Sequence, residues 1–155
     1  MDKYYYEYNT IHREIQNKAQ VIKNSFNPDI ILAIGGGGLI PARILRTFID
    51  KPIYVISVKG YEETIKNDNV EIIQWLDKDL SNKKVLIVDE VDDTRTTLKF
   101  CVDRLRKLNN VKHLGIFVVN NKIKNKVWNL DDNIKYFSAK EMDDIWIVYP
   151  WDTKM

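Results

Sequence analysis

One stretch of sequence decides how this chain folds: Val85-Leu86-Ile87-Val88-Asp89-Glu90-Val91-Asp92-Asp93-Thr94-Arg95-Thr96-Thr97-Leu98. Its first four residues are apolar and three of them are β-branched, a pattern that predicts a short strand buried on both faces of a parallel sheet. We expect this strand to end at Val88, where the acidic residues begin. Similar strands alternate with helices along the chain, which predicts an α/β fold with a mostly parallel sheet flanked by helices.

Four carboxylates follow this strand within five residues, on Asp89, Glu90, Asp92 and Asp93. Like charges this close raise one another's pKa unless a cation or hydroxyl donors neutralise them, so we expect a ligand here. The alternative is the acidic first turn of an ordinary helix. That alternative explains Asp92, Asp93 and Thr94, but it does not explain an acidic pair directly after a buried strand.

Threonines follow the acidic residues at the start of a helix. Apolar residues recur at helical spacing from Leu98 onward, so Thr94, Thr96 and Thr97 are expected at the helix N-terminus. Unpaired backbone N–H groups and the helix dipole favour a phosphate at such a place. Because carboxylates accept hydrogen bonds from vicinal hydroxyls, the acidic pair and the helix N-terminus together suit a sugar phosphate.

The stretch resembles the signature of the type I phosphoribosyltransferases, in which four apolar residues lead to two acidic residues, two further positions, Asp-Thr and a threonine-rich phosphate loop. The resemblance implies that Asp89 and Glu90 hold the ribose hydroxyls of phosphoribosyl pyrophosphate (PRPP) and touch its Mg²⁺ only indirectly. It implies that Asp93, the candidate catalytic residue, lies near N7 of a purine and exchanges a proton with it. Arg95 stands where many members have Gly and is expected to add a cation beside the phosphate. The implied 5′-phosphate site comprises Asp92, Asp93, Thr94, Arg95, Thr96 and Thr97.

An earlier segment combines a strand with a glycine loop. Residues 30–34 predict a second buried strand, which runs into four glycines at 35–38 before helical spacing begins at Leu39. Ordering four glycines costs conformational entropy, which is reasonable where the backbone must approach a ligand closely. A flexible hinge is the alternative. The run lacks the spacing of a dinucleotide fingerprint and the lysine of a Walker loop.

Taken together with the signature, the run Gly37-Gly38-Leu39-Ile40-Pro41 resembles the pyrophosphate-binding loop of the purine phosphoribosyltransferases, especially the xanthine-guanine and hypoxanthine-guanine types. Gly36 stands where many relatives carry Lys or Arg. Arg43 and Arg46 are the nearest replacements, and a solvated surface position is the alternative for both. The implied pyrophosphate site comprises Gly36, Gly37, Gly38 and Arg43.

Two further segments complete the first half of the chain. Apolar spacing predicts a helix over residues 10–26, capped by Asn9 or Thr10. Residues 53–58 predict a third strand, and 70–75 its return strand after a polar stretch. In the family that the signature resembles, a flexible loop follows this third strand and covers the reacting centre. The resemblance implies that Tyr61 lies near the start of this loop.

The last part of the chain supplies candidate purine contacts. Residues 114–119 predict a buried strand, and the resemblance implies that Lys122, just after it, donates to the 6-oxo group of the base. Lys124 or Lys126 could take this role instead, and a solvated loop lysine is the alternative. The run from Trp146 to Asp152 resembles the base-binding hood of the xanthine-guanine enzymes. There Trp146 would stack on the purine and Ile147 would present its carbonyl; an aromatic hairpin packed against the core is the alternative.

Composition limits the remaining possibilities. At 155 residues we expect one domain, 1–155, with hood elements at 1–10 and 134–155. The formal net charge of +2 gives no overall field for nucleic acid or a membrane, and no segment is long and apolar enough to span one, so we expect a cytoplasmic protein. Cys101 is expected in the core, and His12 and His113 are too isolated for a zinc site.

These observations lead to one principal hypothesis, a purine phosphoribosyltransferase that uses Mg²⁺ and acts as a homo-oligomer, a dimer or a tetramer. It would convert guanine, hypoxanthine or xanthine and PRPP to the nucleoside 5′-monophosphate and pyrophosphate in purine salvage. The runner-up is a regulatory protein of the same fold that binds PRPP or a nucleotide without turnover, since fold does not settle function. An RNA-binding regulator would need a basic face, which the near-neutral charge does not offer across the chain.

Overall fold

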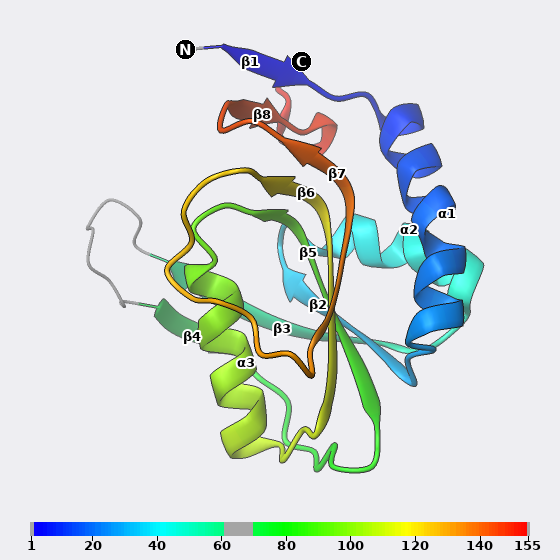
Figure 1. The fold of residues 1–155 in the computed structure, drawn as a ribbon, viewed down its shortest axis with the longest axis vertical. Helices are drawn as coiled ribbons and strands as arrows, with labels where there is room; N and C mark the ends of the chain where they lie inside the picture. Colours follow the sequence, from blue (N-terminus) through cyan, green and yellow to red (C-terminus); the bar gives the residue numbers. More distant parts are fainter. Residues whose placement is uncertain (1, 61–69, 155) are drawn as a thin grey trace.

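The computed structural model describes residues 2–60 and 70–154. Strands and helices alternate through most of this part of the chain (Figure 1). In chain order the elements are β1 (Lys3–Tyr5), α1 (Tyr8–Ser25), β2 (Ile30–Gly35), α2 (Leu39–Ile49), β3 (Ile53–Gly60), β4 (Val70–Gln74), β5 (Lys84–Asp92), α3 (Thr96–Leu108), β6 (His113–Lys122), β7 (Lys135–Met142), β8 (Trp146–Val148) and the 3₁₀ turn η1 (Pro150–Asp152).

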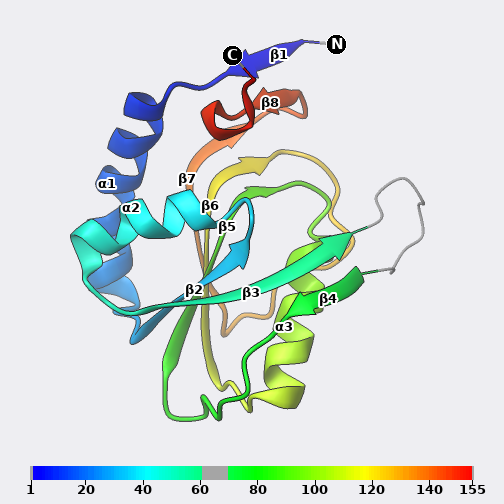
Figure 2. The same cartoon turned by 180° about the vertical axis from the view of Figure 1, so that it is seen from behind.

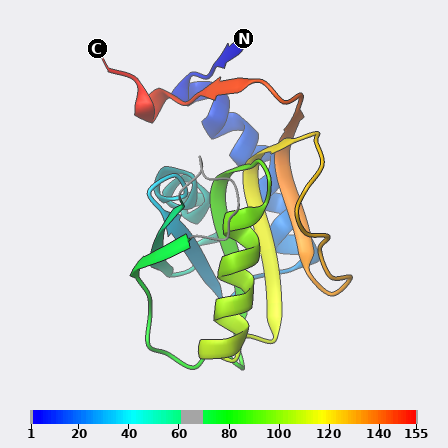
Figure 3. The ribbon, with the colours of Figure 1, turned by 90° about the vertical axis from the view of Figure 1, so that its left-hand side faces the viewer.

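The main sheet has six strands in the order β4-β3-β2-β5-β6-β7. All neighbours run parallel except β3 and β4, which are antiparallel. Helix α3 covers one face of this sheet, and α1 and α2 cover the other (Figure 3). The predicted α/β fold, with a mostly parallel sheet flanked by helices, is therefore confirmed.

Strand β5 lies in the middle of the sheet and is buried on both faces, as its apolar run predicts. Leu86 and Val88 pack with α1 and α2, whereas Val85 and Ile87 pack with α3. This division follows from the alternation of side chains along a strand. Cys101 of α3 belongs to the second cluster and is fully buried, so the core position predicted for it is confirmed.

Two strands are longer than their apolar runs. β5 does not end at Val88 but continues to Asp92, because it keeps pairing with β6 through Val91↔Asn120 and Asp92↔Asn121. β6 likewise extends to Lys122, which pairs with Met142 of β7. Backbone pairing does not depend on apolar side chains, so polar residues at the carboxyl ends of both strands are held in the sheet rather than in loops.

Several local expectations are corrected. Helix α1 begins at Tyr8 after Glu7, because the carbonyl of Glu7 accepts the first helical N–H bonds, so the predicted caps at Asn9 and Thr10 are wrong. The return strand is confirmed as β4, whereas β6 and β7 are joined by residues 123–134 without a helix. Tyr61 lies outside the described residues. No helix in the described part of the chain is long and apolar enough to cross a membrane.

The two ends of the chain meet in a second, two-stranded sheet. β1 pairs parallel with β8, with Lys3 opposite Trp146 and Tyr5 opposite Val148. Figures 1 and 2 show this pair lying beyond the carboxyl ends of the main strands. We call β1, β8 and η1 the hood. β7 falls inside the segment expected for it, but it is the edge strand of the main sheet because its backbone pairs with β6.

Candidate active site

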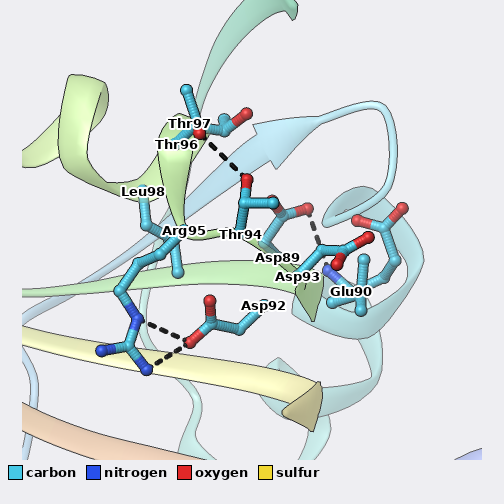
Figure 4. A pocket seen from close by; sticks show the side chains of 10 residues that line it. Asp89, Glu90, Asp92, Asp93, Thr94, Arg95, Thr96, Thr97 and Leu98 are labelled. Carbon is cyan, nitrogen blue, oxygen red and sulfur yellow. Dashed lines mark hydrogen bonds and ion pairs between the residues drawn. The ribbon is translucent and has the colours of Figure 1, made fainter. Parts of the chain in front are cut away.

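A pocket of about 210 Å³ opens where β5 gives way to α3 (Figure 4). The carboxyl ends of parallel strands are the usual place for ligands in such folds, because loops from several strands converge there. The residues that line the pocket are the ten from Asp89 to Leu98. The last ten residues of the quoted stretch are therefore one continuous wall of the site.

The acidic pair sits at the inner end of this wall. The carboxylate of Asp89 is buried and accepts a hydrogen bond from the backbone N–H of Glu90 at 2.9 Å. Burial, followed by the neighbouring charge of Glu90, raises the pKa of Asp89 well above its usual range. No lysine or arginine of the described residues forms an ion pair with either carboxylate in the structure. A ligand that brings hydroxyl donors or a cation would therefore stabilise the ionised pair.

The same pair sets how a magnesium ion could be held. The described residues contain no group of three or more His, Cys, Asp or Glu side chains arranged for a metal. Mg²⁺ usually keeps several waters and is bound through one or two carboxylates together with phosphate oxygens of a substrate. Asp89 and Glu90 fit an ion that arrives with a ligand, which agrees with the indirect contact implied by the sequence.

The helix N-terminus forms the outer end of the wall. Thr94 and Thr96 hydrogen-bond through their hydroxyls at 2.9 Å, and α3 begins at Thr96. Arg95 precedes the helix in the left-handed conformation, with φ 75° and ψ 13°. Glycine adopts this conformation at little cost, so Arg95 stands at a position whose backbone favours Gly. The turn presents hydroxyls and free N–H groups where a phosphate is favoured.

The side chain of Arg95 does not point toward these threonines. Its Nη2 and Nε atoms bind Oδ2 of Asp92 at 2.7 and 2.9 Å, and the Asp92 side chain has no exposed surface (Figure 4). The hydroxyl of Tyr136 donates to the same oxygen at 2.7 Å. A buried carboxylate requires such partners. The expectation that the Arg95 guanidinium lies beside the phosphate is corrected, because Asp92 binds it instead.

The ammonium group of Lys126 binds the backbone of this turn. It donates to the backbone carbonyls of Asp92 and Asp93 at 2.8 Å each and of Lys122 at 2.7 Å. Burial is the main reason that the pKa of Lys126 is lowered. Since its hydrogens are already donated, Lys126 is a poor candidate for the purine contact.

Asp93 faces the pocket and meets the other two lysines. Its side chain is 46% exposed, and Lys124 Nζ binds its Oδ1 at 2.6 Å while Lys122 Nζ lies 3.5 Å from its Oδ2. The hydrogen bond to Asp93 is the largest cause of a raised pKa of Lys124. Asp93, the candidate proton acceptor, and Lys122, the candidate donor to the 6-oxo group, therefore lie side by side although they are distant in sequence.

The glycine loop closes over the acidic pair. A Cβ atom at Gly37 would collide with the carboxylate of Glu90, and one at Gly38 would collide with the carbonyls of Val88 and Ile34, whereas Gly36 has open space. Gly37 and Gly38 are therefore required, because other atoms lie too close to the backbone at these positions for any side chain to fit. The Gly35–Gly36 peptide is cis. Arg43 binds Thr47 on the exposed side of α2, so its side chain is not placed toward the pocket.

The hood carries two exposed aromatic rings, Tyr5 of β1 and Trp146 of β8. Trp146 is 57% exposed, whereas Ile147 beside it is buried in the core. Trp151 stacks on Tyr149 with 5.0 Å between ring centroids and 6° between planes. Trp146 is therefore available to stack on a ligand, while the Trp151 ring is already used within the protein.

A buried polar chain that sequence patterns did not reveal connects the hood to the acidic pair. The Tyr149 hydroxyl lies 2.7 Å from Oδ1 of Asn120 and 3.3 Å from the carbonyl of Glu90. Asn120 donates to the Tyr6 hydroxyl at 2.7 Å, and Tyr6 donates to Glu14 at 2.8 Å. The only signal in the sequence is that Asn120 directly follows the apolar run of β6, since a polar side chain that becomes buried there needs partners.

These features define an α/β protein whose site has two sides. The acidic pair and the α3 N-terminus form a side suited to a phosphorylated sugar. Lys122, Lys124 and Trp146 form a cationic and aromatic side. A family model described as "Phosphoribosyl transferase domain" matches residues 5–155. The chain belongs to the phosphoribosyl transferase family.

Individual proteins of this family are similar to the chain over most of its length. The chain is 43% identical to the hypoxanthine-guanine phosphoribosyltransferase of Schizosaccharomyces pombe, over 97% of this chain and 89% of that protein. It is 39% identical to xanthine phosphoribosyltransferase 1 of Saccharomyces cerevisiae, over 99% and 91%. A solved structure from Neisseria gonorrhoeae, described as a hypothetical protein with bound ppGpp, has a TM-score of 0.85 and 40% identity and covers 98% of this chain and 90% of that one.

Proposed function

We propose that this protein transfers the phosphoribosyl group of PRPP to N9 of a 6-oxopurine. The bond between C1 of the ribose and pyrophosphate breaks, the bond between C1 and N9 forms, and the products are a nucleoside 5′-monophosphate and pyrophosphate. The observation that carries the proposal is the meeting of Asp93 with Lys122 and Lys124 beside the acidic pair and the α3 N-terminus. A protein that bound PRPP alone would need no such base-reading group.

The PRPP side of the site is assigned to the pocket wall. Asp89 and Glu90 accept hydrogen bonds from the ribose hydroxyls, and Mg²⁺ bound through PRPP offsets the charge of the leaving pyrophosphate. Hydroxyls and N–H groups of residues 94–97 hold the 5′-phosphate. Asp92 and Arg95 act through the shape of the turn, since their side chains bind each other. Gly37 and Gly38 let the backbone of the glycine loop approach the pyrophosphate.

The purine side is assigned to β6 and the hood. Lys122 donates to the 6-oxo group, which excludes adenine because its 6-amino group is itself a donor. Asp93 accepts the proton of N7 as N9 forms its bond to the ribose. Trp146 stacks on the ring, and the carbonyl of Ile147 accepts from its edge. The exposed indole of Trp146 supports this assignment.

Incubation with four purines tests the proposal. Purified protein with PRPP and Mg²⁺ should give nucleoside monophosphate from guanine, hypoxanthine or xanthine and none from adenine, and a chelator should abolish the reaction. Absence of product with every 6-oxopurine, while PRPP still raises the melting temperature, would favour the regulatory alternative. Because the Neisseria gonorrhoeae protein holds ppGpp, we include ppGpp as a competitor: a ligand with guanine, ribose and phosphates should raise the apparent KM of PRPP.

The proposal includes three expectations from the sequence: Mg²⁺ as the cofactor, a homo-oligomer, and a cytoplasmic location. Light scattering on the purified protein measures the second of these directly. A monomeric mass in the presence of PRPP and Mg²⁺ would exclude a dimer or tetramer without affecting the proposed chemistry.

A further inference from the structure

A cluster of four charged side chains joins the pocket to the hood. Its members are Asp93, Lys122, Lys124 and Asp144, and we call it the charge bridge. Asp144 lies between β7 and β8, two residues before Trp146. The role assigned to the first two members above does not explain why a second carboxylate faces the same lysines.

The distances within the charge bridge are unequal. Lys124 binds both carboxylates closely, at 2.6 Å to Asp93 and 3.1 Å to Asp144, whereas Lys122 lies 3.5 Å from each. The Lys122 side chain is only 9% exposed. Lys124 therefore makes the strong contacts, and Lys122 is held between two anions at distances that leave it able to donate a hydrogen to a ligand.

The charge bridge also sets the charge that a purine meets. Two ammonium groups face two carboxylates, so its formal charges cancel, and removal of the Asp144 charge alone would leave one excess positive charge. Neighbouring acidic side chains do not replace Asp144: Glu141 binds Asn121 and Ser138. Asp143 is exposed and forms no side-chain ion pair within the described residues.

We propose that Asp144 is a specificity-determining residue, which positions Lys122 and Lys124 at the 6-oxo edge of the purine and offsets the charge of one of them. This inference rests on the proposed function. Xanthine loses a proton more readily than hypoxanthine or guanine, so an excess positive charge at this edge favours xanthine. By cancelling that charge, Asp144 shifts the preference toward the neutral purines hypoxanthine and guanine.

The test compares Asp144→Asn with Asp143→Asn, which removes the same charge one residue away. The ratio of kcat/KM for xanthine to that for hypoxanthine should rise about threefold to tenfold in Asp144→Asn, the range for one partly screened charge nearby. It should stay at the wild-type value in Asp143→Asn. The KM of PRPP and the melting temperature should not change in either variant, because the acidic pair and the core are untouched.

Asp144→Glu separates charge from shape, since it keeps the carboxylate on a longer side chain and should keep the ratio near that of the wild type. An unchanged ratio in Asp144→Asn, or an equal loss for all three purines, would overturn the inference. If the wild type forms no product from any 6-oxopurine, it is the proposed function that fails. The two failures are therefore distinguishable.

Discussion

The signature segment, residues 89–97, and the hood belong to one proposed site but are built differently. The segment is a single run of residues at the junction of β5 and α3, so its groups are brought together by local structure. The hood joins β1 from the start of the chain to β8 near its end. The comparison shows that the side proposed to bind PRPP depends on local geometry, whereas the side proposed to bind the purine depends on long-range pairing.

The signature segment itself contains a second contrast, between the adjacent residues Asp92 and Asp93. Asp92 is buried and bound by Arg95, Tyr136 and Lys126, while Asp93 faces the pocket. Side chains of consecutive residues at a strand end point to opposite sides. One aspartate therefore stabilises the turn and the other is available for chemistry, and substitutions should separate these roles.

The largest expected effect is on turnover, in Asp93→Asn. This change keeps the shape of the side chain but removes the proton acceptor, and general acid–base groups contribute about 10²–10⁴-fold in rate. Steady-state kinetics should show a loss of kcat of this order with little change in the KM of PRPP. The melting temperature should be nearly unchanged because the carboxylate is partly exposed. Turnover at the wild-type rate would reduce Asp93 to a turn residue.

Asp92→Asn should instead lower stability. Removing one partner of a buried ion pair costs about 3–5 kcal/mol, because Arg95 is left without its carboxylate. Urea unfolding measures this free energy. Tyr136→Phe removes a single hydrogen bond to the same oxygen and should cost only ~1 kcal/mol. If Asp92→Asn unfolds at the urea concentration of the wild type, the ion pair does not stabilise the turn.

The hood is tested by Trp146→Ala. Stacking of a base on an aromatic side chain is worth ~1–3 kcal/mol, so the KM of the purine should rise about tenfold, at ~1.4 kcal/mol per factor of ten, while that of PRPP stays nearly constant. Trp151→Ala is the control, since that ring stacks on Tyr149 and its loss should affect stability. Equal losses for both substrates in Trp146→Ala, with a lower melting temperature, would make Trp146 a structural residue.

The smallest effect is expected in the glycine loop, where Gly37→Ala and Gly36→Ala form a matched pair of variants. Gly37→Ala places a methyl group against Glu90, and displacing that carboxylate should raise the KM of PRPP about fivefold, equivalent to ~1 kcal/mol of overpacking. Gly36→Ala has open space and should behave as the wild type. The reverse order of the two variants would show that the loop rearranges when PRPP binds.

Much of this architecture could be predicted from sequence because it is local. The apolar run before Asp89 identifies β5, and the threonines after Asp93 identify the start of α3. The partners chosen by side chains could not be predicted in the same way. Arg95 binds Asp92 because the left-handed turn directs it there, and nothing in the sequence brings Asp144 to Lys124 until β6 and β7 pair. The β1–β8 pairing joins residues too distant for any periodic pattern to reveal.

The most direct measurement of the central claim is the yield of both products from PRPP, Mg²⁺ and guanine. The account predicts that pyrophosphate and guanosine 5′-monophosphate appear in equal amounts, and that the rates of formation of both fall together, by about 10²–10⁴-fold, in Asp93→Asn. Protein that binds PRPP, as shown by a raised melting temperature, but releases neither product would contradict the account. Pyrophosphate without the nucleotide would also contradict it, because water rather than the purine would then accept the phosphoribosyl group.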